Sequence, residues 1–203
     1  MVKSLDDTTE NKILGAARKV FWEKGMAGAR MQDIADQAGI NKALLHYYYR
    51  SKEKLFEVIF REASSLFFMK IAGIIESDIP LFAKIESFCG EYIAMLSQNP
   101  YLPLFVLNEA NKQPYRFKQR FWKNRENLFE RFARDIMMEI ENKKIRPLKP
   151  AHLFMNMVSM CVFPFIAKPI WMMSSGMKED EFIHFLEERK KIVPEFIICS
   201  IKK

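Results

Sequence analysis

Residues 33–56, DIADQAGINKALLHYYYRSKEKLF, decide how the first part of this chain folds. Apolar side chains begin just before this stretch and continue into it, at Met31, Ile34, Ala35 and Ala38. Their spacing places them on one face of a short amphipathic helix. Gly39 supplies a left-handed residue that ends a helix, Asn41 can cap the next helix, and Ser51 can cap a third. Two short helices joined by a tight turn that contains glycine predict a helix-turn-helix.

The second helix of this motif has an outer face suited to a DNA groove. At 100° per residue, Leu45 and Tyr49 lie toward the first helix, whereas Ala43 and Tyr47 lie on the opposite side. Small and apolar side chains let a helix approach base edges and thymine methyl groups, and Tyr and Lys can reach phosphate oxygens. The alternative is a helical hairpin whose aromatic residues form core. That alternative is favoured for Tyr48 and Tyr49, but the angles argue against it for Tyr47 and His46.

The residues of this stretch resemble the N-terminal domain of the TetR (tetracycline-repressor) family. The match is continuous over about residues 8–60 and rests on Gly25, Asp33-Ile34-Ala35, Ala38-Gly39-Ile40, Asn41-Lys42, Leu45, Tyr48-Tyr49, Ser51-Lys52-Glu53 and Leu55. The chain departs from the family pattern at Ala29-Arg30, where the family often has Thr or Ser, so the first helix of the motif lacks an obvious side-chain cap. It departs again at Ala43-Leu44, which replace a small polar pair and affect which bases are read.

The outer face and the resemblance together predict which side chains contact DNA. Phosphate contacts are expected from Arg30, Lys42, Tyr47, Tyr48 and Lys52. Base contacts are expected from Gln32, Ala43, Leu44 and His46. The predicted partner is a double-stranded, near-palindromic operator that two copies of the motif read in successive major grooves.

The composition predicts an all-α fold. The 203 residues include only seven glycines and no alternating runs of β-branched residues. The resemblance implies an N-terminal three-helix DNA-binding domain with the helix-turn-helix, followed by a helical bundle that binds an effector and dimerises. We place the first domain at residues 1–54 and the second at 55–203. No linker of Gly or Ser separates them, so the helix that follows Ser51 is expected to continue through residues 52–75.

Later helices are predicted from apolar spacing and from prolines at residues 80–98, 104–110, 114–144, 150–173 and 178–200. The run at 153–173, LFMNMVSMCVFPFIAKPIWMM, is long enough to raise a membrane span, but Asn156, Lys168 and two prolines argue against one. A helix that is apolar on most sides must pack against other helices on most sides, which suggests that a second subunit contributes. The resemblance implies a homodimer through the last two helices. Candidate contributors are Ala151, Met155, Val158, Val162, Phe182, Phe185, Leu186, Ile192 and Phe196.

No catalytic or metal-binding pattern is present in the sequence. The three histidines lack metal-ligand spacing to Cys or to one another, and no nucleophile elbow or phosphate-binding glycine loop occurs. We therefore expect neither an enzyme nor a cofactor. The net charge of +7 suits a polyanionic partner. Cys89, Cys161 and Cys199 lie in apolar runs and are expected to be reduced and buried in a cytoplasmic protein.

An effector pocket is predicted in the second domain, because its helices carry more Phe and Met than simple packing needs. The expected lining is Phe67, Phe88, Tyr92, Phe105, Phe121, Met157, Met160 and Trp171, with Asn108 or Glu109 as the polar group. Flexible methionines accommodate ligands of varied shape, so a small hydrophobic or aromatic effector fits this lining. The alternative is that these side chains fill an ordinary core.

The favoured hypothesis is a ligand-responsive, sequence-specific transcriptional regulator that acts as a repressor and is released from its operator by the effector. The alternative is a helical adaptor or small-molecule-binding protein of the same fold, without a role in transcription. Sequence-specific, salt-dependent DNA binding would separate the two.

Overall fold

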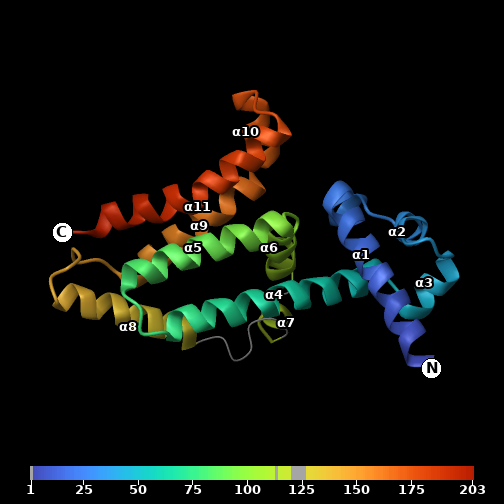
Figure 1. The fold of residues 1–203 in the computed structure, drawn as a ribbon, viewed down its shortest axis with the longest axis horizontal. Coiled ribbons are helices and arrows are strands. Elements are labelled where there is room, and N and C mark those ends of the chain that lie inside the picture. Colours follow the sequence, from blue (N-terminus) through green and yellow to red (C-terminus); the bar gives the residue numbers. More distant parts are fainter. Residues whose placement is uncertain (1, 113, 120–126) are drawn as a thin grey trace. The chain divides into compact units, whose positions relative to one another are not determined.

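The computed structural model describes residues 2–112, 114–119 and 127–203 (Figure 1). These residues are predominantly helical and contain no β-strand beyond one isolated bridge, between Ile145 and Lys202. They divide into two compact units, Met1–Ser65 and Leu66–Lys203. The prediction of an all-α fold is confirmed.

The N-terminal unit contains α1 (Val2–Gly28), α2 (Met31–Ala38), α3 (Lys42–Tyr48) and the first turns of α4 (Lys52–Glu76). Its core side chains come from all four helices: Ile13, Ala17, Phe21, Ile34, Leu45, Leu55, Phe56 and Ile59. The rings of Phe21 and Phe56 meet edge to face, with centroids 5.0 Å apart. Because α4 contributes to this core, the unit extends along α4 to Ser65, later than the boundary that we predict after residue 54.

The first helix is joined to the helix-turn-helix by one side-chain bond. α1 begins at Val2 and contains a kink at Gly25, whose φ of 64° lies in the left-handed region. Glu10 of α1 accepts a hydrogen bond from the Tyr49 hydroxyl at 2.6 Å. That bond ties the residue after α3 to α1. Burial, followed by the bond to Glu10, raises the pKa of Tyr49.

The described part of the C-terminal unit contains the rest of α4 and the helices α5 (Leu81–Gln98), α6 (Leu102–Lys112), α7 (Pro114–Phe117), α8 (Asn127–Glu141), α9 (Pro150–Ile166), α10 (Lys168–Ser175) and α11 (Glu179–Ile201). Its centre is formed by α5, α9 and α11, which pack side by side (Figure 1). Their buried residues recur every three or four positions, as expected for helices with one covered face. Ile85, Cys89 and Ile93 line α5 in this way.

Two predicted helices are divided in the structure. The predicted helix 114–144 corresponds to α7 and α8, and residues 120–126 between them lie outside the described residues. The predicted helix 150–173 is broken at Ala167, and α9 and α10 meet at an angle of 70°. Pro169 lacks an N–H to donate and is accommodated in the first turn of α10. Within the described residues, no single helix is long and apolar enough to cross a bilayer; only the bent pair α9 and α10 together reaches that length and hydropathy.

An ion pair lies in the interior of the C-terminal unit. Lys84 of α5 is buried, and its Nζ is 2.6 Å from Asp135 Oδ2 of α8. The same Nζ donates to the backbone oxygen of Ile75 at 2.8 Å, near the C-terminal end of α4. Three helices therefore meet at one ammonium group.

The cysteines are only partly as predicted. Cys89 and Cys161 are buried, whereas Cys199 is exposed. Cys199 lies three residues after Phe196 and seven after Ile192, which are both exposed on α11, so it shares their outward face.

Candidate DNA-binding and effector-binding sites

The turn of the helix-turn-helix is fixed by local bonds. Gly39 takes the left-handed conformation (φ 66°, ψ 33°), and its N–H donates to the Asp36 oxygen at 3.2 Å. The N–H of Ile40 donates to the Ala35 oxygen at 3.0 Å. Asn41 Oδ1 then accepts from the Leu44 N–H at 2.7 Å, which confirms the predicted cap of α3. The end of α2 and the start of α3 are thereby held in register.

A carboxylate compensates for the missing cap before α2. Asp33 Oδ2 accepts from the backbone N–H of Arg30 at 3.2 Å and lies 3.0 Å from Lys24 Nζ. The hydrogen bond from Lys24, with a smaller contribution from the Arg30 backbone, holds the pKa of Asp33 below its ordinary value. A carboxylate also interacts favourably with the positive end of the helix dipole. Although Ala29-Arg30 provides no side-chain cap, Asp33 thus stabilises the start of α2.

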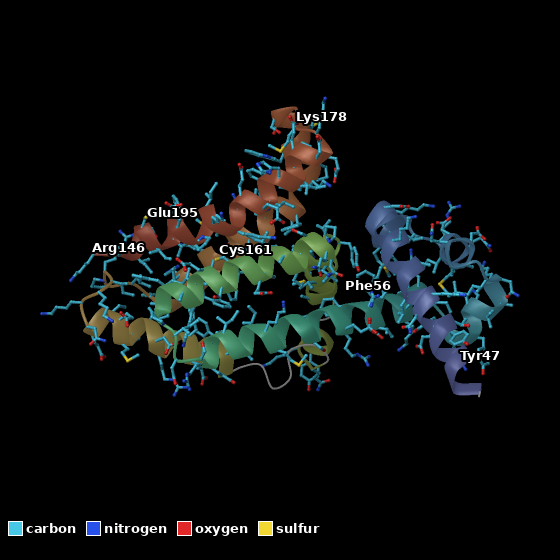
Figure 2. The ribbon with its side chains drawn as sticks, in the orientation of Figure 1. Tyr47, Phe56, Arg146, Cys161, Lys178 and Glu195 are labelled. Carbon is cyan, nitrogen blue, oxygen red and sulfur yellow. The ribbon has the colours of Figure 1, made fainter. Side chains whose placement is uncertain are left out.

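The outer face of α3 is oriented as predicted. Leu45 and Tyr49 are buried, whereas the side chains on the opposite side are exposed: Lys42, Ala43, Leu44, His46 and Tyr47. Tyr47 is the most open of these aromatic residues, with 81% of its surface exposed, and it projects from the N-terminal unit (Figure 2). Its ring meets that of the half-buried Tyr48 edge to face at 5.6 Å. This arrangement leaves an apolar and aromatic surface with one lysine at its edge.

Two of the other predicted DNA contacts, Gln32 and Lys52, have intramolecular side-chain bonds. Gln32, exposed on α2, donates to Asp36 Oδ1 at 2.7 Å, and Arg30 is exposed before the helix. Lys52 Nζ donates to the backbone oxygens of Met26 at 2.8 Å and Ala29 at 2.9 Å. The ammonium therefore stabilises the carbonyl end of α1. The phosphate contact of Lys52 stays a prediction, and its structural bonds were not foreseen.

Three of the predicted effector-binding side chains lie within the packed helices. Phe88 and Tyr92 of α5 form an edge-to-face pair with centroids 5.7 Å apart, and Met157 of α9 is fully buried. Phe154 of α9, which we do not predict, connects this region to α8. Its ring lies 6.0 Å from Phe88, 5.5 Å from Phe129 and 6.3 Å from Phe132, centroid to centroid.

Trp171, another predicted lining residue, lies at the surface instead. Trp171 lies on α10, is 45% exposed, and stacks on Phe185 of α11 at 6.0 Å. The bend at Ala167 separates its helix from α9, so Trp171 is a surface residue of the single chain. Met160 is half-buried, and its backbone oxygen accepts from Arg189. The predictions that lie outside the described side chains are Phe67, Phe105, Asn108, Glu109 and Phe121.

A group of polar side chains inside the C-terminal unit has no clear signal in the sequence. The thiols of Cys89 and Cys161 are hydrogen-bonded to each other across α5 and α9, and this bond and burial raise the pKa of Cys161. Burial raises the pKa of Tyr92, so its hydroxyl stays protonated at neutral pH. Arg189 of α11 approaches the same thiol (Figure 2 marks Cys161). Members of this group on different helices are separated by at least 28 positions in the sequence. Spacing along the chain therefore gave no indication of the group.

The outer faces of α9 and α11 carry exposed apolar side chains among polar ones. Met155 and Phe163 are exposed on α9, and Ile192 and Phe196 are exposed on α11. Phe182 and Leu186, which we expected to contact a second subunit, are instead buried within the chain. They lie on the inner face of α11 together with Val193 and Ile197, and the dimer-contact prediction for those two residues is wrong for this reason.

No group of three or more His, Cys, Asp or Glu side chains suited to a metal ion occurs among the described residues. That part of the chain therefore gives no support for a metal site built from such a cluster.

Comparisons with known proteins agree with the helix-turn-helix. The family model described as "Bacterial regulatory proteins, tetR family" matches residues 13–59. The uncharacterized HTH-type transcriptional regulator YfiR of Bacillus subtilis is 26% identical over 171 residues, which cover 77% of this chain and 80% of that protein. The HTH-type transcriptional repressor NicS of Pseudomonas putida is 46% identical over 50 residues, 25% of this chain and 24% of that one.

A solved structure extends the likeness of fold over the full chain. The transcriptional regulator FadR from Bacillus subtilis, in complex with stearoyl-CoA, has a TM-score of 0.64 and 17% sequence identity. The alignment covers 94% of this chain and 98% of that chain.

Proposed function

Because its helix-turn-helix domain places this chain in the TetR family of transcriptional regulators, we propose that it is a ligand-responsive repressor. In this proposal a homodimer binds a near-palindromic operator and leaves it when a small apolar effector binds. The observation that carries the proposal is the outer face of α3. That face exposes Leu44, Tyr47 and their neighbours while Leu45 holds the helix to its own domain.

DNA recognition is assigned to the N-terminal ends of α2 and α3 and to the outer face of α3. Ala43, Leu44 and His46 are exposed there and carry small, apolar or hydrogen-bonding groups that suit base edges. Lys42 and Tyr47 stand beside them, where a cation and a phenol can bind phosphate oxygens. The tight caps at Gly39 and Asn41 support this assignment, since a recognition helix must be held rigidly to discriminate between sequences.

Dimerisation is assigned to the outer faces of α9 and α11. Met155, Phe163, Ile192 and Phe196 leave an apolar surface on helices that already pack against each other. Such a surface is costly in water and suits a second copy, which would form a four-helix arrangement. A stable interface of this kind buries more than about 1,000 Å². Two N-terminal domains would then occupy major grooves about 34–36 Å apart.

The effector is assigned to the interior of the C-terminal unit. Phe88, Tyr92, Phe154 and Met157 form an aromatic and sulfur-containing surface between α5 and α9. Such surfaces bind apolar ligands. The complex of the similar FadR with stearoyl-CoA supports a long or bulky apolar ligand for this fold.

Coupling is assigned to α4, which contributes residues to both compact units. Near its C-terminal end, the backbone oxygen of Ile75 is held by Lys84. An effector that favours a different position of α5 or α8 would alter the hydrogen bond between Lys84 and Ile75. Because Ile75 belongs to α4, this change would shift the chain away from the state that binds DNA. A difference of about 1–3 kcal/mol in effector affinity between the two states changes affinity for the operator roughly 5- to 150-fold.

The experiment is a DNA-binding titration with the full chain. The DNA upstream of its own gene is compared with an unrelated duplex of equal length, at low and at physiological salt. The proposal expects tighter binding to the upstream DNA and weaker binding at higher salt. Equal binding to both duplexes, or no binding at low salt, would instead favour a helical adaptor of the same fold.

A further inference from the structure

Arg189 of α11 is a half-buried cation with incomplete hydrogen bonding in the C-terminal unit. One of its donors, Nη2, binds the backbone oxygen of Met160 at 2.7 Å. Its Nε is enclosed, and no acceptor in the described part of the chain reaches it. A buried donor without a partner costs free energy, and more so when it belongs to a charged group.

The charge of Arg189 also lacks a counter-ion among the described residues. None of the ion pairs there includes it, although neighbouring residues of α11 do pair, such as Lys190 with Glu187. The guanidinium instead lies 5.5 Å from the centroid of the Phe185 ring. Removal from water lowers the pKa of Arg189, which reflects the cost of holding this charge there. A partly buried arginine normally has a carboxylate or phosphate partner.

The surroundings of Arg189 contain donors rather than strong acceptors. The nearby Cys161 thiol is hydrogen-bonded to Cys89, and sulfur accepts hydrogen bonds only weakly. The Tyr92 hydroxyl, whose pKa responds to the same thiol, is protonated. Met157 and Phe88, which stand near Cys161 and Cys89 along their own helices, are buried and apolar. An apolar surface beside one uncompensated cation matches an apolar ligand that ends in an anion.

Arg189 lies on the inner face of α11, three residues after Leu186 and four before Val193, which are both buried. A second copy that docks on the outer face of α11 would therefore not meet its Nε. Met160, whose oxygen accepts from Arg189, lies about one turn from Met157 on α9, next to the region to which the effector is assigned.

We propose that Arg189 binds the carboxylate of an aliphatic acid, and that the effector of this protein therefore belongs to the class of apolar carboxylates rather than neutral apolar molecules. The planar guanidinium can donate two parallel hydrogen bonds to one carboxylate. The hydrocarbon part of the acid would lie against Phe88, Phe154 and Met157. This inference rests on the proposed function only in calling the ligand an effector.

The test uses the full chain and two probes with the same hydrocarbon body, decanoate and decan-1-ol, titrated by calorimetry. Wild-type protein should bind decanoate about tenfold more tightly or better, the usual contribution of a hydrogen bond to a charged group. Arg189→Gln should abolish this preference, and Arg189→Lys should retain part of it. Arg134→Gln, which makes the same change at an exposed position on α8, should leave the preference intact.

Equal binding of the two probes by the wild type, or binding of neither, overturns the inference. So does a preference that persists in Arg189→Gln. If Arg189→Gln does not fold, the wild-type comparison and Arg189→Lys still decide the matter. DNA binding is measured separately. If the chain prefers decanoate but binds no DNA, only the proposed function is contradicted. If it binds its operator without preferring decanoate, only the carboxylate assignment is contradicted.

Discussion

Lys84 Nζ lies 2.6 Å from Asp135 Oδ2, inside the C-terminal unit, and the two residues stand 51 positions apart in the chain. The ammonium also holds the oxygen of Ile75, so α4, α5 and α8 share one polar contact. Removal of one partner leaves the other charge buried without compensation, which is strongly destabilising.

The Asp135→Asn variant should therefore lose about 3 kcal/mol or more of free energy of unfolding, measured in urea. The double variant Lys84→Met/Asp135→Leu should recover much of that loss, since well-packed apolar side chains often replace a buried ion pair without cost. A single variant as stable as the wild type would show that the pair is not a structural anchor.

Tyr47→Phe removes one exposed hydroxyl from the outer face of α3 and leaves the ring in place. If that hydroxyl binds a phosphate, affinity should fall by about 1 kcal/mol for every DNA sequence alike, as for one ordinary hydrogen bond. The matched control is Tyr115→Phe, another exposed tyrosine outside the motif, which should change nothing. A loss confined to one operator sequence would mean that Tyr47 reads bases.

Asn41→Ala removes the side-chain oxygen that accepts the Leu44 N–H. The variant should unfold more readily by about 1 kcal/mol, the usual contribution of a helix N-cap, and should bind DNA less tightly because α3 frays at its start. Asn41→Ser keeps an uncharged acceptor and should restore both properties. Unfolding in urea and a binding titration on the same samples check this, and equal stability of the alanine and serine variants would speak against the cap.

Phe196→Glu places a charge on the outer face of α11, where the phenylalanine is 60% exposed in the single chain. The fold of one chain should tolerate this change, but an apolar interface between two copies should not. Sedimentation should show a dimer for the wild type and a monomer for the variant. Met69→Glu, at a similarly exposed apolar position on α4, is the control and should remain dimeric. A wild-type chain that sediments as a monomer would remove the basis for this prediction.

The motif could be predicted from the sequence because its determinants are local. Gly39, Asn41 and the outward direction of Tyr47 depend on neighbours within one or two turns, and the structure has each as expected. The break at Ala167 lies between the two prolines of the apolar run, but two separate helices were not predicted because such a run can also form one kinked helix. Because the chain bends at this residue, Trp171 lies at the surface rather than in the interior.

The polar contacts of the C-terminal unit were not predictable in the same way. Lys84 meets Asp135, and Arg189 meets Met160, only after distant helices have packed. An isolated lysine or arginine in a helical sequence is usually a solvated residue, so neither position stood out. The inward direction of Phe182 and Leu186 likewise depends on which face of α11 packs against α5 and α9, and the sequence offered two apolar faces.

The central claim is sequence-specific binding of DNA through the outer face of α3. Its most direct test is selection of bound duplexes from a random library by the full wild-type chain, with Leu44→Glu as the comparison. The account predicts enrichment of one near-palindrome with half-sites about one helical turn apart, bound at least about 10³-fold more tightly than random DNA, and no enrichment by the variant. Absence of any enriched site with the wild type, or the same site enriched by Leu44→Glu, would contradict it.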